Sequence, residues 1–311
     1  MKHLPFQSFL VKLQLNLSSR TKEEVVKDTI NKASVAAIFR WKERKRKTLQ
    51  ILFIRRADNK RDVWSGQVAI PGGRRQLKSF SETVGGNSSK KWESSRETAI
   101  RETFEEVGLR LDKPYVRWIG QLESIQTHLR SIHVTTEVFL VDRSEEEQAV
   151  ILKTQPKEVA NVFWVNVEEL YNSNRYHNLI WPMKTYFEKL TGFRVLGQLL
   201  HRIVGDTIFP CIYLPRPCPK VQNEDDSSIP RHHSEYILWG LTLQIVLKLC
   251  EGGRCPLPFA NSPFRCTNRC GASLLSLFRL HSRSAMILAI GLSIGLSGAY
   301  KLVKAEFTQR N

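Results

Sequence analysis

The sequence has few cysteines, and their spacing excludes two classes of protein. Six cysteines in 311 residues are too few for a fold held together by disulfides. Four of them fall late in the chain, at Cys250, Cys255, Cys266 and Cys270, without the paired C-x-x-C spacing of common zinc sites. Free thiols in a reducing compartment are therefore the favoured interpretation, and a metal cluster is the alternative.

Acidic residues are also scarce. They number 30 against 47 lysines and arginines, which gives a net charge of +17 and a pI near 9.8. Such an excess suggests nucleic acid, an anionic membrane surface or phosphate-rich substrates as partners. The positive charge is spread along the chain, as in the run 41–47, and no helix-turn-helix or zinc-finger spacing is present. We therefore expect a general affinity for anions or an organelle address, and no specific nucleic acid partner.

The first 22 residues contain no acid. Leucines and phenylalanines alternate there with serine and glutamine, and the basic residues are Lys2, Lys12, Arg20 and Lys22. This pattern is typical of a mitochondrial transit peptide, while a helix that frays or packs on the domain is the alternative. Residues 1–32 are thus an N-terminal segment, and a mitochondrial or peroxisomal location is favoured over the cytosol.

Short apolar runs and helical patterns between residues 33 and 250 predict one domain. Strands are expected over 34–40, 49–55, 66–73, 115–120, 134–141, 158–165 and 209–214. Helices are expected over 93–107, 168–171 and 236–249. Residues 74–92 are rich in Ser, Lys, Gly and Asn, which predicts an irregular inserted loop. Mixed strands with separated helices favour an α/β fold, a sandwich with helices on both faces of a mixed sheet.

A C-terminal extension follows the predicted domain. Residues 251–283 are expected to form an irregular basic linker. Residues 285–300 carry no charge, but sixteen helical residues rise roughly 24 Å, short of the roughly 30 Å hydrocarbon core. Over 284–304, with Lys301 snorkelling to the surface, the segment becomes a candidate membrane anchor. A soluble amphipathic or packed helix is the alternative.

Three glutamates crowd into five residues of the predicted helix 93–107. Glu102 lies three and four residues before Glu105 and Glu106, so the three carboxylates share one edge of the helix. A divalent cation such as Mg²⁺ or Mn²⁺ relieves their repulsion, because these ions prefer oxygen ligands. Arg101 can fix the side chain of Glu105 through a charge-assisted hydrogen bond. A solvated acidic face is the alternative.

The rest of that helix is expected to pack inward. Gly108 follows at a position where helices commonly stop. The predicted buried stripe is Ala99, Ile100, Thr103, Phe104 and Val107.

This segment resembles the Nudix box: Gly, five residues, Glu, seven residues, Arg-Glu, an apolar residue, any residue, Glu-Glu, any residue, Gly and an apolar residue. Thr103 departs from the apolar position, and Asn87 stands where the glycine is expected. We therefore infer an insertion within 74–92 and assign Gly73 as the displaced glycine. The matching residues are Glu93, Arg101, Glu102, Glu105, Glu106, Gly108 and Leu109.

Residues 52–74 are similar to coenzyme A diphosphatases, which share an apolar strand ending in Arg, a Gly-Gln pair and a Pro-Gly-Gly run. The resemblance covers about 33–250 and implies a Nudix-type α/β/α sandwich. It implies hydrolysis of coenzyme A or acyl-CoA to adenosine 3′,5′-bisphosphate and 4′-phosphopantetheine or its acyl form. The alternatives are ADP-ribose, dinucleotides or oxidised nucleotides as substrates, or a non-catalytic Nudix-fold module that binds phosphorylated ligands.

The resemblance also implies roles for single residues. Mg²⁺ or Mn²⁺ would be held by Glu102, Glu105, Glu106 and Gly73, and would activate the attacking water. One of these glutamates, or Glu123 from a later loop, would act as the base. Glu93 would brace the junction of loop and helix. The residues expected to bind the phosphates are Arg55, Arg56, Arg61, Gly72, Gly73 and Arg74. We further expect Trp64 to pack in the core, and the enzyme to form a homodimer.

Overall fold

The computed structural model describes residues 6–19, 32–59, 64–80, 89–127, 132–142, 152–181, 183–184, 188, 193–215, 236–258 and 265–266. The chain divides into two compact units, one made of residues 1–177 and 211–259, the other of residues 178–210 and 260–311. Arg61 and the segment 284–304 lie outside the described residues.

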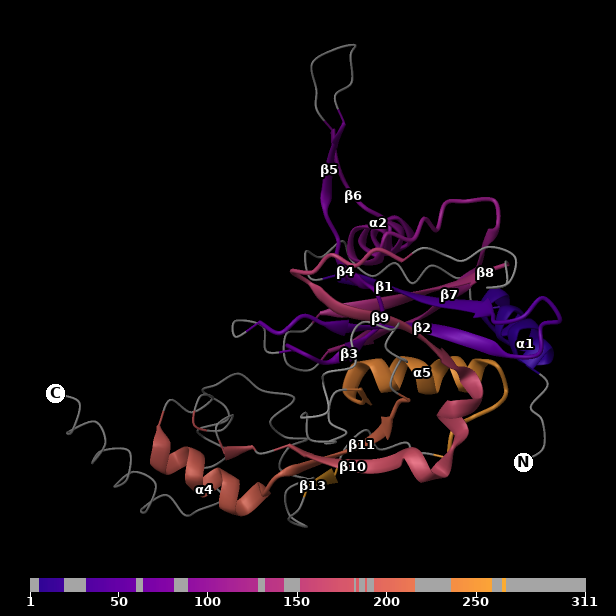
Figure 1. Ribbon diagram of the computed structural model, residues 1–311. Helices are drawn as coiled ribbons and strands as arrows, with labels where there is room; N and C mark the ends of the chain where they lie inside the picture. Colours follow the sequence, from indigo (N-terminus) through magenta and orange to yellow (C-terminus); the bar gives the residue numbers. More distant parts are fainter. Residues whose placement is uncertain are drawn as a thin grey trace, which may run out of the picture. The chain divides into compact units, whose positions relative to one another are not determined.

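A mixed seven-stranded sheet forms the centre of the first unit (Figure 1). Its strand order is β3-β2-β1-β8-β7, while β4 pairs with β1 and β9 pairs with β2. The strands β1 and β8 are parallel and the other pairs are antiparallel, which confirms the predicted mixed sheet. The strands are β1 (Lys32–Trp41), β2 (Leu49–Arg56), β3 (Val68–Ala69), β4 (Gly72–Arg74), β7 (Val116–Gln126), β8 (His133–Val141) and β9 (Val159–Asn166).

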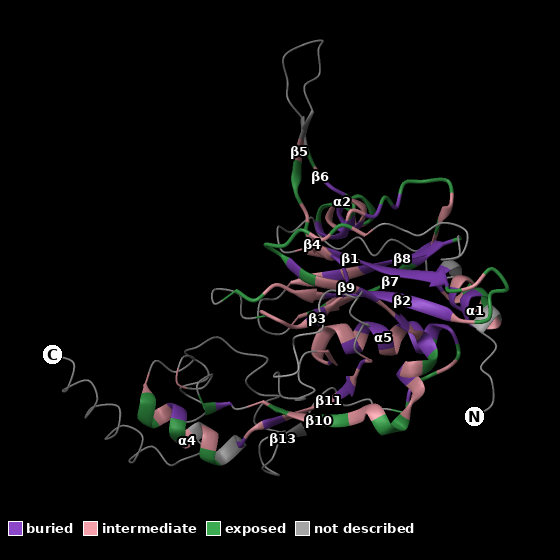
Figure 2. Cartoon of the chain, viewed as in Figure 1, coloured by how far each residue is buried: buried purple, intermediate pink, exposed green. Residues whose placement is uncertain are grey.

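Helices cover both faces of this sheet (Figures 1 and 2). Because successive side chains of a strand point to opposite faces, β1 serves two cores. Ala36 and Ile38 pack in the core beneath α2 (Ser95–Val107). Ala37 and Phe39 pack in the other core, with α1 (Phe6–Ser19) and α5 (Gly240–Gly252). The predicted α/β/α sandwich is confirmed.

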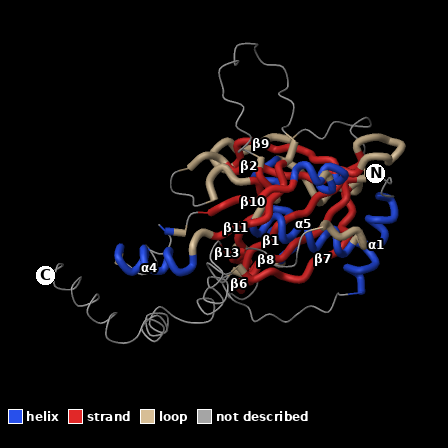
Figure 3. Tube along the Cα trace, turned by 90° about the horizontal axis from the view of Figure 1, so that it is seen from below, coloured by secondary structure: helices blue, strands red, loops and turns tan. Residues whose placement is uncertain are grey.

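Helix α1 is part of this core. Phe9, Leu13 and Leu17 are at most 1% exposed, and the helix lies beside β7 (Figure 3). Of the two alternatives for the N-terminal segment, the structure therefore shows the helix that packs on the domain. The transit peptide stays a prediction.

Two predictions between residues 66 and 92 are wrong. The single strand 66–73 is two short strands, β3 and β4, because the Pro71-Gly72 step turns the chain toward β1. The loop predicted over 74–92 contains an antiparallel hairpin of β5 (Leu77–Phe80) and β6 (Ser89–Trp92). Cross-strand pairing thus orders the base of the insertion, despite its polar composition.

Two predicted helices start later than expected. The helix predicted from Glu93 begins at Ser95, because Ser94 is its N-cap. The helix predicted from Tyr236 is preceded by the strand β12 (Ile237–Leu238), and Gly240 follows at φ 59, so α5 begins only there. The short helix predicted over 168–171 is confirmed as the 3-10 turn η1 (Val167–Tyr171), followed by η2 (Ser173–Arg175).

The remaining elements include a short helix and further strands. In the first unit, β12 pairs with the end of β11 (Thr207–Tyr213). In the second unit, the start of β11 pairs with β13 (Arg265–Cys266). The other elements are β10 (Tyr176–Trp181) and α4 (Arg194–Val204). Among the described residues, none of the helices has both the length and the apolar character that a membrane crossing needs.

Candidate active site

Both ends of α2 are fixed by its sequence. At the start, Ser94 accepts a hydrogen bond from the backbone N–H of Glu97, and the Glu97 carboxylate accepts one from Ser94 in return, which is a capping box. At the end, Gly108 adopts φ 70, so the predicted stop is confirmed. These two caps fix where the helix that carries the glutamates begins and ends.

The buried stripe of α2 is only partly as predicted. Ala99, Thr103 and Val107 are buried, but Phe104 is 49% exposed, so its assignment to the stripe is wrong. Thr103 fits an apolar position because its hydroxyl donates to the carbonyl of Ala99 at 2.7 Å. The departure from the box pattern at this position is thereby accommodated.

Arg101 binds three carboxylates at once. Its Nε and Nη2 atoms lie 2.8 and 3.0 Å from the two carboxylate oxygens of Glu93. Its Nη1 atom lies 2.9 Å from Glu102 and 2.8 Å from Glu105. Nη2 also donates to the carbonyl of Arg74 at 3.0 Å. The predicted contact with Glu105 is present, and the contacts with Glu93, Glu102 and Arg74 were not foreseen.

Glu93 lies at the junction of the inserted hairpin and α2, as a bracing role requires. It is 3% exposed and accepts hydrogen bonds from the Gln76 backbone and the Thr98 hydroxyl. Burial by itself would raise the pKa of Glu93. The hydrogen bonds from Arg101 and Gln76 outweigh it and hold that pKa below its ordinary value.

The backbone at Gly72 and Gly73 lies against two of the box glutamates. The N–H of Gly72 donates to Glu106 Oε2 at 2.9 Å. A Cβ atom on Gly73 would lie 2.5 Å from the carboxyl carbon of Glu102. Gly72 also has φ 153 and lies close to the Ser34 carbonyl, so neither position has room for a side chain. The insertion therefore leaves the glycine loop in place beside the helix, which agrees with the assignment of Gly73.

The carboxylates of this site differ in burial and in pKa. Glu106 is 4% exposed, and burial, together with the nearby charges of Glu102 and Glu158, raises its pKa to about 8. Burial also raises the pKa of Glu102, and Glu105 and Glu158 add to that effect. The side chain of Glu105 is 46% exposed. The ionised forms of Glu102 and Glu106 are thus destabilised, and a nearby positive charge would stabilise them.

The acids fit a divalent cation in part. Among the described residues, no three His, Cys, Asp or Glu side chains are gathered closely enough to hold a metal ion. Glu105 is turned to Arg101 and Glu106 to the Gly72 N–H, which separates the three predicted ligands. Glu102 and Glu106 are nevertheless desolvated oxygen donors beside a glycine backbone, which is the donor chemistry that Mg²⁺ and Mn²⁺ prefer. These two residues fit such an ion, and Glu105 would have to leave Arg101 to join them.

The structure separates the predicted phosphate-binding arginines. Along β2, Ile54 packs in the core beneath α2, and Phe53 packs in the opposite core. By this alternation Arg56 faces α2, where its charge lowers the pKa of Glu106. Arg55 points to the other face, where its Nη2 atom lies 3.2 Å from Asp58, and its role in binding phosphate stays a prediction. Arg74 is exposed and contributes its carbonyl to Arg101.

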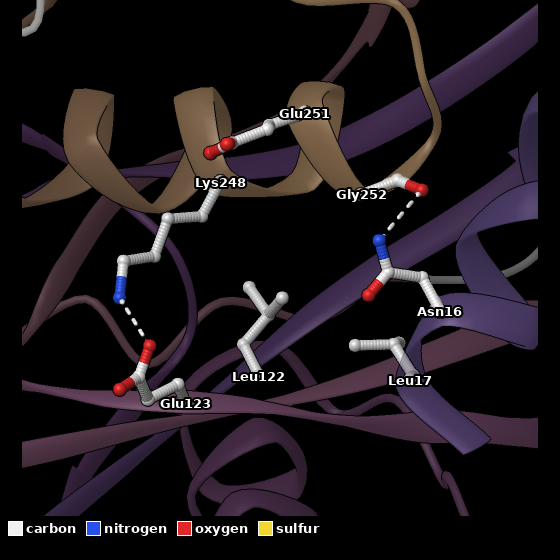
Figure 4. Close-up of a pocket in the computed structure, with 7 residues that line it drawn as sticks. All are labelled: Asn16, Leu17, Leu122, Glu123, Lys248, Glu251 and Gly252. Atoms are coloured by element: carbon white, nitrogen blue, oxygen red, sulfur yellow. Dashed lines mark hydrogen bonds and ion pairs between the residues drawn. The ribbon is translucent and has the colours of Figure 1, made fainter. Parts of the chain in front are cut away.

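Two other predictions fail for reasons of position. Glu123 pairs with Lys248 at 3.5 Å. Both line a pocket of ≈ 230 Å³ among α1, β7 and α5, away from α2, which removes Glu123 as the candidate base (Figure 4). Trp64 is 38% exposed and so is not a core residue.

Glu158 is the acid that the sequence analysis missed. It precedes β9, whose first residue pairs with Arg56 at the end of β2. The N–H of Ala57 donates to its carbonyl at 2.9 Å, and Gln155 in the same loop donates to the carbonyl of Glu106 at 3.0 Å. This loop brings the Glu158 charge close enough to affect Glu102 and Glu106. The signal available in the sequence was an acid at the start of the predicted strand 158–165.

Replacement of Gly73 by alanine should abolish most activity without unfolding the chain. The added Cβ would overlap the Glu102 carboxyl group and push it away from Glu106. We expect turnover to fall by at least about tenfold, since displacing a catalytic group by about 1 Å can lower rates by about two orders of magnitude. Steady-state kinetics and circular dichroism would check this. The matched control is Gly197→Ala, which crowds a glycine of the second unit; normal kinetics for Gly73→Ala would contradict the proposed contact.

Comparisons with known proteins complete the description of this site. The model of the NUDIX domain family matches residues 31–187. An uncharacterized protein of Schizosaccharomyces pombe is 32% identical over 169 residues, which cover 53% of this chain and 46% of that relative. The chain thus matches about half the length of this relative.

Solved structures of low similarity also match. The Nudix hydrolase RenU from M. smegmatis is 14% identical, with 45% of this chain and 73% of that chain covered and a TM-score of 0.32. The NUDIX domain of Shewanella oneidensis NrtR, complexed with ADP ribose, is 17% identical, with 50% and 84% covered and a TM-score of 0.30. At these TM-scores the likenesses carry no argument about substrate.

Proposed function

We propose that this chain, which belongs to the NUDIX domain family as the match over residues 31–187 shows, is a Nudix pyrophosphohydrolase whose substrate is coenzyme A or acyl-CoA. The products would be adenosine 3′,5′-bisphosphate and 4′-phosphopantetheine or its acyl form. Water would add to one phosphorus and break the bond to the bridging oxygen. The observation that carries the proposed hydrolysis of a diphosphate is the glycine loop, with Gly72 bound to Glu106 and Gly73 against Glu102.

The side chains of the site would divide the work. Arg56 faces Glu106 and supplies positive charge for a phosphate, with Arg74 as a second, exposed candidate. Gly72 and Gly73 have no side chains, so a phosphate can approach their backbone closely. Arg101 is a positioning residue, because it donates hydrogen bonds to Glu102 and Glu105 and so fixes their side chains.

A divalent cation held by Glu102 and Glu106, with Glu105 as a further ligand, would neutralise charge on the diphosphate and lower the pKa of the attacking water. Glu158 is the candidate base from outside α2, in place of Glu123. Its loop is fixed to the end of α2 by the hydrogen bond from Gln155 to Glu106. Glu158 would take the proton from the attacking water and hold it beside the site.

The support for coenzyme A is the similarity of residues 52–74 to coenzyme A diphosphatases. The cations Arg56 and Arg74 also suit a substrate with an extra 3′-phosphate. Hydrolysis of ADP-ribose, dinucleotides or oxidised nucleotides is the second candidate. A non-catalytic module is disfavoured, because such a module has no need for Glu102, Glu105 and Glu106 on one edge of α2. The mitochondrial or peroxisomal location and the homodimer stay predictions.

The test is a substrate panel with the purified full chain and Mg²⁺ or Mn²⁺. We expect adenosine 3′,5′-bisphosphate to be released from coenzyme A and its thioesters, and little turnover of ADP-ribose or dinucleotides. Dephospho-coenzyme A is the matched control, since it differs only by the 3′-phosphate, and its KM should be higher. Preferred turnover of ADP-ribose would select the second candidate, and binding without any turnover would indicate the module.

A further inference from the structure

A surface with exposed apolar and basic side chains lies at the end of the sheet away from the glutamates. We call it the α1–turn surface, and it consists of the outer side of α1, the turn 42–47 between β1 and β2, and Arg117. The start of β1 pairs with β4 at the glycine loop, while the turn follows the other end of the same strand. The two sites are therefore separated by the length of β1.

The helix contributes exposed apolar side chains. Its inner side is filled by Phe9, Leu13 and Leu17, yet Val11 is 59% exposed and Leu15 is 66% exposed. Val11 and Leu15 are four residues apart, so they lie one above the other on the outer side of α1. The helix contains no acidic residue, and Lys12 lies next to Val11. The helix therefore offers two exposed aliphatic side chains to this surface and adds no negative charge to it.

The turn contributes a dense group of cations. Its only acid, Glu43, accepts hydrogen bonds from the backbone and the hydroxyl of Thr48, at 2.9 and 2.8 Å, and so serves the turn itself. Arg46 pairs with Asp142 at 2.7 Å. The exposed lysines and arginines of the turn are Lys42, Arg44, Lys45, Arg46 and Lys47. The turn therefore keeps a strongly positive outer side. Figure 2 shows this exposed turn beside α1.

A hollow joins the helix and the turn. It has a volume of ≈ 230 Å³, and Val11, Arg46 and Arg117 all line it. Its remaining lining residues, Leu10, Trp41 and Leu140, are at most 6% exposed and give it an apolar floor. An apolar floor with two arginines beside it suits the headgroup and glycerol region of an anionic lipid.

We propose that the α1–turn surface binds anionic phospholipid bilayers. The cations would contact phosphate and carboxylate headgroups, and Val11 and Leu15 would enter the interface below them. Nucleic acid is less suited to this surface, because single strands bind on aromatic side chains, and the exposed apolar residues here are aliphatic. The proposal does not depend on the proposed hydrolase substrate.

The test is co-sedimentation of the full chain with vesicles of phosphatidylcholine alone or of phosphatidylcholine with phosphatidylserine. We expect binding only to the vesicles with phosphatidylserine, and weaker binding as salt rises. The double variant Lys45→Ser, Lys47→Ser should lower the partition coefficient by about tenfold or more. Leu15→Asp should lower it by at least about tenfold as well, with unchanged thermal unfolding, since the side chain is exposed.

The matched control is Lys153→Ser, Lys157→Ser, which removes the same charge near the start of β9, at the other end of β2 from the turn. It should bind vesicles with phosphatidylserine as the unaltered chain does. Equal binding to both kinds of vesicle, or an equal loss in the control variant, would overturn the proposal. So would binding to single-stranded RNA that Leu15→Asp leaves unchanged, together with no binding to vesicles.

Discussion

Glu106→Gln is expected to lower turnover by about two orders of magnitude or more, since a lost metal contact removes several kcal/mol of transition-state stabilisation. The same variant should fold at least as stably as the unaltered chain at neutral pH. Glutamine keeps an oxygen that can accept from the Gly72 N–H, and it removes a carboxylate that is 4% exposed. Loss of rate without loss of stability separates a catalytic role from a structural one.

The sign of the stability effect follows from the pKa of Glu106. Burial raises that pKa from 4.5 to about 8, so the folded chain favours the protonated carboxyl group. A carboxyl group whose pKa is raised on folding contributes stability that is fully present below its pKa in the unfolded chain. That stability is lost as the pH rises through its pKa in the folded chain. Without added metal, the unaltered chain should therefore lose more stability between about pH 5 and pH 8 than Glu106→Gln does.

Urea unfolding at these two pH values, with and without Mg²⁺, would measure the difference. Glu105→Gln is the matched control, because it removes a box carboxylate that is 46% exposed. It should lower turnover as well, but it should not flatten the pH dependence of stability. Unchanged turnover in both variants would contradict the metal-helix account, whatever the substrate proves to be.

The fold could be predicted where a local pattern decides it. The apolar runs of β1, β2, β8 and β9 and the stop at Gly108 are set by side-chain alternation and by a backbone conformation that glycine favours. The hairpin β5–β6 could not be predicted, because its order comes from cross-strand pairing rather than from composition. Phe104 fails for a related reason, since the apolar pattern of α2 does not say how far the sheet extends beneath it.

The site could be predicted where residues share one element. The spacing of Glu102, Glu105 and Glu106 gives a common edge on any helix. The contribution of Glu158 depends on the packing of a loop against the end of α2, which no local spacing encodes. The choice between Arg55 and Arg56 depended on which face of the sheet α2 covers, although alternation already required the two to point apart.

Arg101→Ala is expected to have the largest effect on stability. The side chain of Glu93 is 4% exposed and lies 2.8 Å from Arg101 Nε, so the variant would leave a buried carboxylate with much of its compensation removed. Breaking a buried ion pair by removing one partner destabilises a protein by about 3–5 kcal/mol. Because Glu102 and Glu105 would lose the same cation, their mutual repulsion adds to the effect.

Chemical unfolding monitored by circular dichroism would measure this loss, with Arg101→Lys as the control. Lysine keeps the positive charge but cannot reach both oxygens of Glu93 and also Glu105, because it lacks the planar fork of guanidinium. We therefore expect Arg101→Lys to recover only part of the stability. The double variant Arg101→Ala, Glu93→Gln should be more stable than Arg101→Ala alone, because it no longer buries an unpaired charge. If the two were equally unstable, the ion pair would not be what fixes the hairpin to α2.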